Sequence, residues 1–289
     1  MAYSERPASA DAAITLTTQT GLLLFYRIDT GLATVGRIDE AGNYTDLKNH
    51  RFDKDWVRLF PLGNGFVAFK KRPRLGGELL VGRVQPDGNY QDLTVHTAFF
   101  DDDATLVAVN DNIVLVQHSP RDITILRVKE DGAFERLRTH GGFDASTHVI
   151  STHDGLVLFY NQASRKVTTI RVQIDGNVLK LKSLSGFDPW THLISTTNRM
   201  LLFYNRGTGA AATGRLDADG DYKDLGTYQF DRDWKDIVPT LDGHVFFSNL
   251  AGGPPRTTVL GRIDTNGGYS DGPVLNGVFD PWNLVVPVI

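Results

Sequence analysis

The sequence predicts an all-β fold, a six-bladed β-propeller, and three observations favour it. One pattern of apolar and polar residues recurs six times along the 289 residues. Each recurrence contains four short β-type runs separated by turn dipeptides such as Asp-Gly and Asn-Gly, which supply the positive φ angles of tight hairpins. No segment shows the sustained apolar period of about 3.6 residues that an amphipathic helix needs.

The repeat is recognised by landmarks that follow one another in every unit. An apolar run comes first, as in Leu22–Tyr26, Leu156–Tyr160 and Leu201–Tyr204. An arginine follows, 44 to 47 residues after the previous one, at Arg37, Arg83, Arg127, Arg171, Arg215 and Arg262. A turn glycine lies five residues after each arginine, and a Phe-Asp pair closes the unit. Units of about 45 residues are typical of repeat arrays, and six of them cover nearly the whole chain.

The last unit shows the expected order of elements. Residues 235–240 are a short apolar stretch, Asp242-Gly243 is a turn, and residues 244–248 are β-branched and aromatic. A Gly/Pro loop follows at residues 249–255, then a third strand at residues 257–263 and a turn into a last strand at Tyr269. This order predicts a four-stranded antiparallel meander in each unit.

A single meander cannot bury both of its faces, whereas a ring of meanders packs face to face, which favours a propeller. An open β-solenoid and a large closed barrel are the alternative architectures. We expect residues 13–289 to form a single propeller domain behind an N-terminal extension of residues 1–12. Two segments compete for the first strand of the first unit, Ile14–Thr18 and Leu284–Ile289. Propellers commonly join both termini in one blade, which removes an exposed sheet edge.

Composition excludes several classes of function. With 34 acidic and 30 basic side chains the net charge is -4, which argues against a general nucleic-acid binder. The chain has no cysteine, so it has no disulfide or thiolate metal site. It contains no apolar run of about 18 residues and no signal-peptide core, so we expect no membrane insertion, and a protein that is cytoplasmic or released by a route other than general secretion. We find no cofactor motif and no metal-ligand spacing, and the sequence leaves the oligomeric state open.

The recurring arginine and the recurring aspartate predict a structural clamp in each blade. A guanidinium fork binds a carboxylate and nearby carbonyl groups with a fixed geometry. The arginines are those given above, and the aspartates are Asp53, Asp101, Asp144, Asp188, Asp231 and Asp280. The functional alternative is a set of six equivalent sites for anionic ligands.

The four tryptophans are the strongest candidates for ligand binding. All of them follow a Phe-Asp pair by two or three residues, at Trp56, Trp190, Trp234 and Trp282, whereas the corresponding positions of units two and three carry Ala104 and Ser146. The loops expected on the same face begin with Arg27, Asn161, Asn205 and Asn249 in the same four units. If each tryptophan belongs to the following blade, the match falls to units one, five and six. An indole beside amide and carboxylate groups suits a sugar ring; blade-to-blade packing and turn formation are the structural alternatives.

On these repeats and aromatic loops the chain resembles the repeat β-propeller lectins of bacteria, fungi and invertebrates. The resemblance covers residues 13–289 at the level of architecture, and no lectin signature matches residue by residue. It implies a multivalent carbohydrate-binding protein with glycans or glycoconjugates as partners, in which several weak sites act together.

Two other functions remain open from the sequence. An enzyme, a hydrolase or a lyase, would place one asymmetric site at the central channel and draw on irregular residues such as His148, His153, His192 or Asp101–Asp103. A protein-interaction platform is the third possibility, because one fold can host many unrelated functions.

Overall fold

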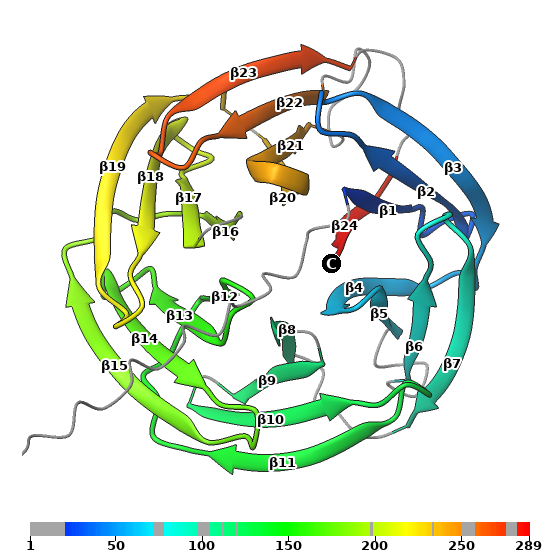
Figure 1. The fold of residues 1–289 in the computed structure, drawn as a ribbon, viewed down its shortest axis with the longest axis horizontal. Coiled ribbons are helices and arrows are strands. Elements are labelled where there is room, and N and C mark those ends of the chain that lie inside the picture. The colour runs from blue at the N-terminus through cyan, green and yellow to red at the C-terminus, as the bar shows by residue number, and fades with distance from the viewer. Residues whose placement is uncertain are drawn as a thin grey trace, which may run out of the picture.

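The computed structural model describes residues 21–71, 78–97, 104–110, 112–119, 121–196, 199–232, 234–249, 258–275 and 282–289. These residues form six four-stranded antiparallel sheets arranged as blades around a central axis (Figure 1). The predicted six-bladed β-propeller is therefore confirmed. None of the described residues belongs to a helix that is long and apolar enough to cross a membrane.

Each blade is a meander whose first strand lies nearest the axis and whose fourth strand lies at the rim. Blade 1 contains β24 (Leu284–Val288), β1 (Leu22–Tyr26), β2 (Leu32–Ile38) and β3 (Tyr44–Arg51). Blade 2 contains β4 (Trp56–Gly63), β5 (Phe66–Lys71), β6 (Leu79–Val84) and β7 (Tyr90–His96). Blade 3 contains β8 (Thr105–Asn110), β9 (Ile113–Ser119), β10 (Asp122–Val128) and β11 (Phe134–His140).

The other three blades are continuous in sequence. Blade 4 contains β12 (His148–Ser151), β13 (Leu156–Asn161), β14 (Lys166–Val172) and β15 (Val178–Ser185). Blade 5 contains β16 (His192–Ser195), β17 (Met200–Tyr204), β18 (Ala210–Leu216) and β19 (Tyr222–Gln229). Blade 6 contains β20 (Asp236–Pro239), β21 (His244–Ser248), β22 (Thr258–Ile263) and β23 (Tyr269–Val274).

The C-terminal strand closes the ring. β24 pairs antiparallel with β1, with Leu284 opposite Tyr26 and Val288 opposite Leu22. The backbone N–H of Gly65 in blade 2 also donates to the carbonyl of Ile289 at 2.8 Å. The competing segment Ile14–Thr18 lies outside the described residues. Blade 1 is thus assembled from both ends of the chain, whereas each of the other five comes from one stretch of sequence.

The core lies between neighbouring blades rather than within one. The second strands are almost entirely buried, as in β1 and β17, where every residue is buried. The described residues form six hydrophobic clusters, and one of them joins Leu158 of blade 4 to Phe203 of blade 5. Both faces of every blade are therefore covered by a neighbour, which is why a single repeat is not stable alone.

A glycine and a tyrosine form a repeated pair behind a β-bulge. In every blade the register between the third and fourth strands shifts at the residue before the recurring arginine, as between Thr213 and Gly214. A Cβ at Gly214 would lie within 2.2 to 2.4 Å of the Tyr222 ring and hydroxyl. Blade 4, which has Val178 in place of the tyrosine, carries Ile170 in place of the glycine. The glycine is needed only where a tyrosine covers the bulge.

Gly214→Ala should therefore destabilise the protein by about 1–3 kcal/mol, the usual cost of overpacking. In a Tyr222→Val background, which introduces the valine that blade 4 has at this position, the same change should cost almost nothing. The measurement is the free energy of unfolding in urea for the four members of this double-mutant cycle. Equal costs of Gly214→Ala in the two backgrounds would contradict the pairing.

Candidate functional site

The four tryptophans are buried between blades. Their side chains expose only 3 to 7% of their surface. Each indole packs against the phenylalanine of the second strand in the following blade, with ring centroids 5.7 to 6.0 Å apart: Trp56 on Phe69, Trp190 on Phe203, Trp234 on Phe247 and Trp282 on Phe25. The expected stacking surface for sugars is therefore not available, because core packing occupies the indole faces.

The residues that begin the loops after the second strands stabilise turns. Asn161 Nδ2 donates to the carbonyl of Ala145 at 2.5 Å, and Asn205 Nδ2 donates to that of Pro189 at 2.8 Å. Their side-chain oxygens accept backbone N–H groups of the same loops. Arg27 forms an ion pair with Asp29, and Asn249 is half-buried at the end of β21. Because each tryptophan packs on the following blade, its coincidence with these residues falls to units one, five and six.

Four of the six recurring arginines contact the next blade, and among the described residues none is seen to pair with a Phe-Asp aspartate. Arg127 Nη2 donates to the carbonyl of Ile174, and Arg171 Nη2 donates to that of Ala218, at 3.0 and 2.8 Å. Arg37 reaches Pro86 and Arg83 reaches Glu130 in the same way, whereas Arg215 and Arg262 pair with Asp217 and Asp242. Arg37, Arg83, Arg127 and Arg171 thus join one blade to the next, and the arginine contacts of the described residues are with partners other than the expected aspartates.

The Phe-Asp aspartates lie at the other end of the blades, which explains the difference. Arg171 is opposite Leu156 at the start of β13, whereas the carbonyl of Asp188 accepts the hydroxyl of Tyr160, near its end. Asp53 and Asp231 accept tyrosine hydroxyls in the same way. The carboxylate of Asp144 lines a pocket in blade 4. Asp101 and Asp280 lie outside the described residues.

The irregular residues at the inner strands gather in three consecutive blades. His148, His192 and Asp236 each begin the inner strand of blades 4, 5 and 6. Each of the three pairs with the residue that ends the buried run of the second strand in its blade. These partners are Tyr160, Tyr204 and Ser248. They therefore occupy equivalent places at one end of the axis, which we call the loop face because the loop of Asn161 and the segment of Trp190 lie there.

Both histidines are fully engaged by the scaffold. His148 Nε2 lies 3.0 Å from the carbonyl of Thr191, and His192 Nε2 lies 3.2 Å from that of Lys235. Each Nδ1 lies 2.9 Å from the hydroxyl of the preceding threonine. Burial lowers the pKa of both imidazoles, so they are neutral near pH 7 and donate through Nε2–H. These histidines join blade to blade and leave no free nitrogen for acid–base chemistry.

Asp236 occupies the same place in blade 6 without such partners. Its Oδ2 atom is buried and has no hydrogen-bond partner among the described residues. Ser248, directly opposite on β21, is fully buried and its hydroxyl is also unpaired. In blades 1, 4 and 5 a tyrosine stands at the position of Ser248, and its hydroxyl bonds to the next blade. The shorter serine leaves a carboxylate and a hydroxyl side by side with unused bonding capacity.

Burial shifts the protonation equilibrium of Asp236. Desolvation raises the pKa of its carboxyl, while the positive charges of Lys235 and Arg206 oppose that shift. Lys235 Nζ also donates to the carbonyl of Asn283 in blade 1, at 3.2 Å. A buried carboxyl with a raised pKa beside two cations is an arrangement common at catalytic sites.

The remaining candidates from the sequence do not join this group. His153 lies in the turn after β12, at the opposite end of that strand from His148, with a positive φ of 62°. Burial lowers the pKa of its imidazole to about 4. Asp101–Asp103 lie outside the described residues. Within the described ranges, no three His, Cys, Asp or Glu side chains are placed to hold a metal ion.

Comparisons with known proteins find fold relatives only. No protein family and no curated protein sequence matches the chain. A putative 6-phosphogluconolactonase from Bacteroides uniformis superposes with a TM-score of 0.59 at 14% identity, covering 91% of this chain and 83% of that chain. A putative 6-phosphogluconolactonase from Bacteroides fragilis gives 0.58 at 16% identity, covering 94% and 86%. The periplasmic gluconolactonase PpgL of Pseudomonas aeruginosa gives 0.57 at 13% identity, covering 93% and 99%.

These findings correct the lectin hypothesis and its glycan partners. The tryptophans that were to bind sugars form the core between blades. The similar solved structures named above carry the names of gluconolactonases, not of lectins. Regular repetition misled the prediction, because residues that recur in most blades here serve the contacts between blades. The irregular residue Asp236 was missed. The signal was the change from histidine to aspartate at one repeat position and from tyrosine to serine at the position opposite it.

Proposed function

We propose that the protein is a hydrolase that opens a small cyclic ester, a lactone, on its loop face, with Asp236 as the general base. The observation that carries the proposal is the buried, unpaired Oδ2 of Asp236. An unpaired buried carboxylate is costly to fold, and such costs are typical of functional sites. The names of the gluconolactonases with the same fold support a lactone as the substrate class.

The residues around Asp236 suit each part of this reaction. The carboxylate takes a proton from a water molecule while the water oxygen adds to the lactone carbonyl carbon. The carbonyl oxygen becomes negatively charged, and the cations of Lys235 and Arg206 stabilise that charge,. The ring C–O bond then breaks, and the proton passes from Asp236 to the leaving alkoxide oxygen. The product is an open hydroxy acid, and the carboxylate is regenerated.

Asp236→Asn should lower kcat/KM for lactone hydrolysis by about 10²–10⁴-fold, the usual contribution of a general base. The same variant should be more stable than the parent at neutral pH. A raised pKa in the folded state means that the unfolded chain loses its proton first as pH rises, so Asp236 lowers stability above the ordinary aspartate range near 3.9. The measurements are pH-stat hydrolysis of glucono-δ-lactone and other aldonolactones, and urea unfolding at pH 4 and pH 7.

Two further variants complete this test. Ser248→Tyr introduces the residue of blades 1, 4 and 5 and should fill the space beside Asp236, so that activity is lost while the fold is kept. Glu40→Gln removes an exposed carboxylate from a turn of blade 1 and should leave the rate unchanged. Full activity of folded Asp236→Asn, or no turnover of any lactone by the folded parent, would refute the proposal.

A further inference from the structure

The interface between blades 3 and 4 lacks the tryptophan that fills four of the other five interfaces, and it has Ser146 in its place, as the interface between blades 2 and 3 has Ala104. Ser146-Thr-His148 in blade 4 aligns with Trp190-Thr-His192 in blade 5, and the threonine and histidine contacts are the same in both. The serine hydroxyl accepts a hydrogen bond from Gln117 Nε2 of blade 3 at 2.7 Å. The backbone is therefore kept, and only the indole is missing.

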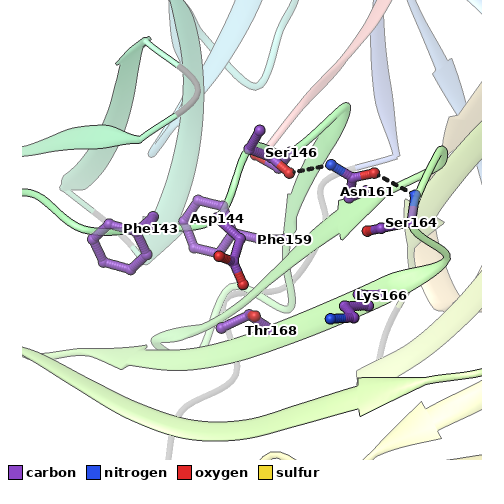
Figure 2. A pocket seen from close by; sticks show the side chains of 9 residues that line it. Phe143, Asp144, Ser146, Phe159, Asn161, Ser164, Lys166 and Thr168 are labelled. Carbon is purple, nitrogen blue, oxygen red and sulfur yellow. Dashed lines mark hydrogen bonds between the residues drawn. The ribbon is translucent and has the colours of Figure 1, made fainter.

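A pocket of about 230 Å³ occupies this place. It is lined by the loop before β12, the end of β13, the turn that follows, and β14 (Figure 2). Its lining residues are Phe143, Asp144, Ala145, Ser146, Phe159, Asn161, Ser164, Lys166 and Thr168. In blade 5 the matching residues Phe187, Phe203, Ala210 and Ala212 belong to the same hydrophobic cluster as Trp190.

Two phenyl rings form the apolar wall of the pocket. Phe159 is the equivalent of Phe203, on which Trp190 packs with centroids 5.9 Å apart. In blade 4 Phe159 keeps its contact with Phe143, with centroids 5.3 Å apart and an angle of 26° between the rings, as Phe203 contacts Phe187 in blade 5, and only the indole is absent. Cavities with aromatic or aliphatic walls bind flat apolar rings readily. The wall thus suits a ring of about the size of the missing indole.

Two side chains of opposite charge line the same pocket. The carboxylate of Asp144 and the ammonium of Lys166 line it together with the Thr168 hydroxyl (Figure 2). Asp144 and Lys166 are both exposed residues, and neither forms an ion pair among the described residues. Blade 5 keeps the carboxylate as Asp188 but has Ala210 in place of Lys166. The pair of free charges is a property of blade 4 that the scaffold does not need.

From this combination we propose that the blade 4 pocket binds a free aromatic amino acid. The side-chain ring lies against Phe159, the α-ammonium group pairs with Asp144, and the α-carboxylate pairs with Lys166. Charge-assisted contacts of this kind fix orientation, while ring burial supplies most of the affinity. The pocket belongs to a different blade from Asp236, so this proposal stands apart from the hydrolase.

The test is ligand-observed ¹⁹F NMR with 5-fluoro-L-tryptophan as the probe and the full chain as the receptor. We expect saturable line broadening that excess L-tryptophan reverses. Ser146→Trp, which introduces the side chain of blade 5, should abolish it. Lys166→Ala and Asp144→Asn should each weaken binding by about tenfold, as expected for the loss of one charged contact, and both keep the core of the pocket intact.

Trp190→Ser provides a matched control on the same scaffold. It opens the equivalent notch in blade 5, which has a carboxylate and no lysine. In a protein that also carries Ser146→Trp, this second notch should bind 5-fluorotryptamine about as well as 5-fluoro-L-tryptophan, because nothing there pairs with the carboxylate.

No broadening with the parent, or broadening that persists in folded Ser146→Trp, would overturn the proposal. So would parent binding that is equal for 5-fluoroindole and 5-fluoro-L-tryptophan, since the charges would then contribute nothing.

Discussion

Deletion of residues 284–289 should abolish cooperative folding. The deletion removes β24, the inner strand of blade 1, and leaves β1 as an open edge at the closure of the ring. Val285 and Val288 are 7% and 1% exposed, and full burial of a valine contributes about 1.5–3 kcal/mol. The free energy contributed by these two side chains and the strand hydrogen bonds together approaches the total free energy of unfolding of an ordinary domain, about 5–15 kcal/mol. The measurement is urea unfolding followed by near-UV circular dichroism, with size-exclusion chromatography for aggregation.

A circular permutant provides the control for this deletion. Val288 lies opposite Leu22, so an Asn-Gly turn that links residue 289 to residue 21 would make blade 1 a continuous meander, as Asn64-Gly65 does in blade 2. The permuted chain would then begin at residue 282 and end at residue 281. We expect this permutant to unfold cooperatively. A stable, cooperatively folded deletion variant would show that β24 is not needed for closure.

Trp190→Ala should lower the free energy of unfolding by about 3–5 kcal/mol, the usual cost of truncating a buried tryptophan. The indole is 7% exposed, packs on Phe203, and belongs to the cluster that joins blades 4 and 5. Its backbone N–H also donates to the Tyr160 hydroxyl at 3.0 Å, a contact that the substitution keeps. The loss therefore reports packing alone, measured by urea unfolding with the other three tryptophans as fluorescent probes.

Ser146→Ala is the matched substitution at the equivalent position of blade 4. It removes only the contact with Gln117, so it should cost about 0.5–1.5 kcal/mol, the net value of one hydrogen bond. A cost below about 0.5 kcal/mol for Trp190→Ala, which is the range of exposed substitutions, would contradict the burial of the indole.

Much of the fold could be predicted from the sequence because each repeat is defined by short-range features, namely its turn residues and its apolar runs. The turn glycines, such as Gly88 and Gly176, have φ angles of 85° and 84°, which any four-stranded meander of this kind requires. The Gly214 and Tyr222 pair was also visible in principle, since the glycine is present in the blades that have the tyrosine. The candidate site was harder to predict from the sequence, because Asp236 and Ser248 are twelve residues apart and neither belongs to a known motif.

By itself the sequence determined the number of blades, their strand order and the positions of their turns, because hydrogen-bonded hairpins depend on neighbouring residues. Only the tertiary structure decided which terminus closes the ring, that Trp190 faces a phenylalanine and not solvent, and that Arg127 binds the next blade. It also decided that, among the described residues, the Oδ2 atom of Asp236 has no hydrogen-bond partner, whereas both ring nitrogens of His192 have one. These contacts join residues on different blades or different strands, and the direction in which a side chain points is fixed by packing that no local pattern encodes.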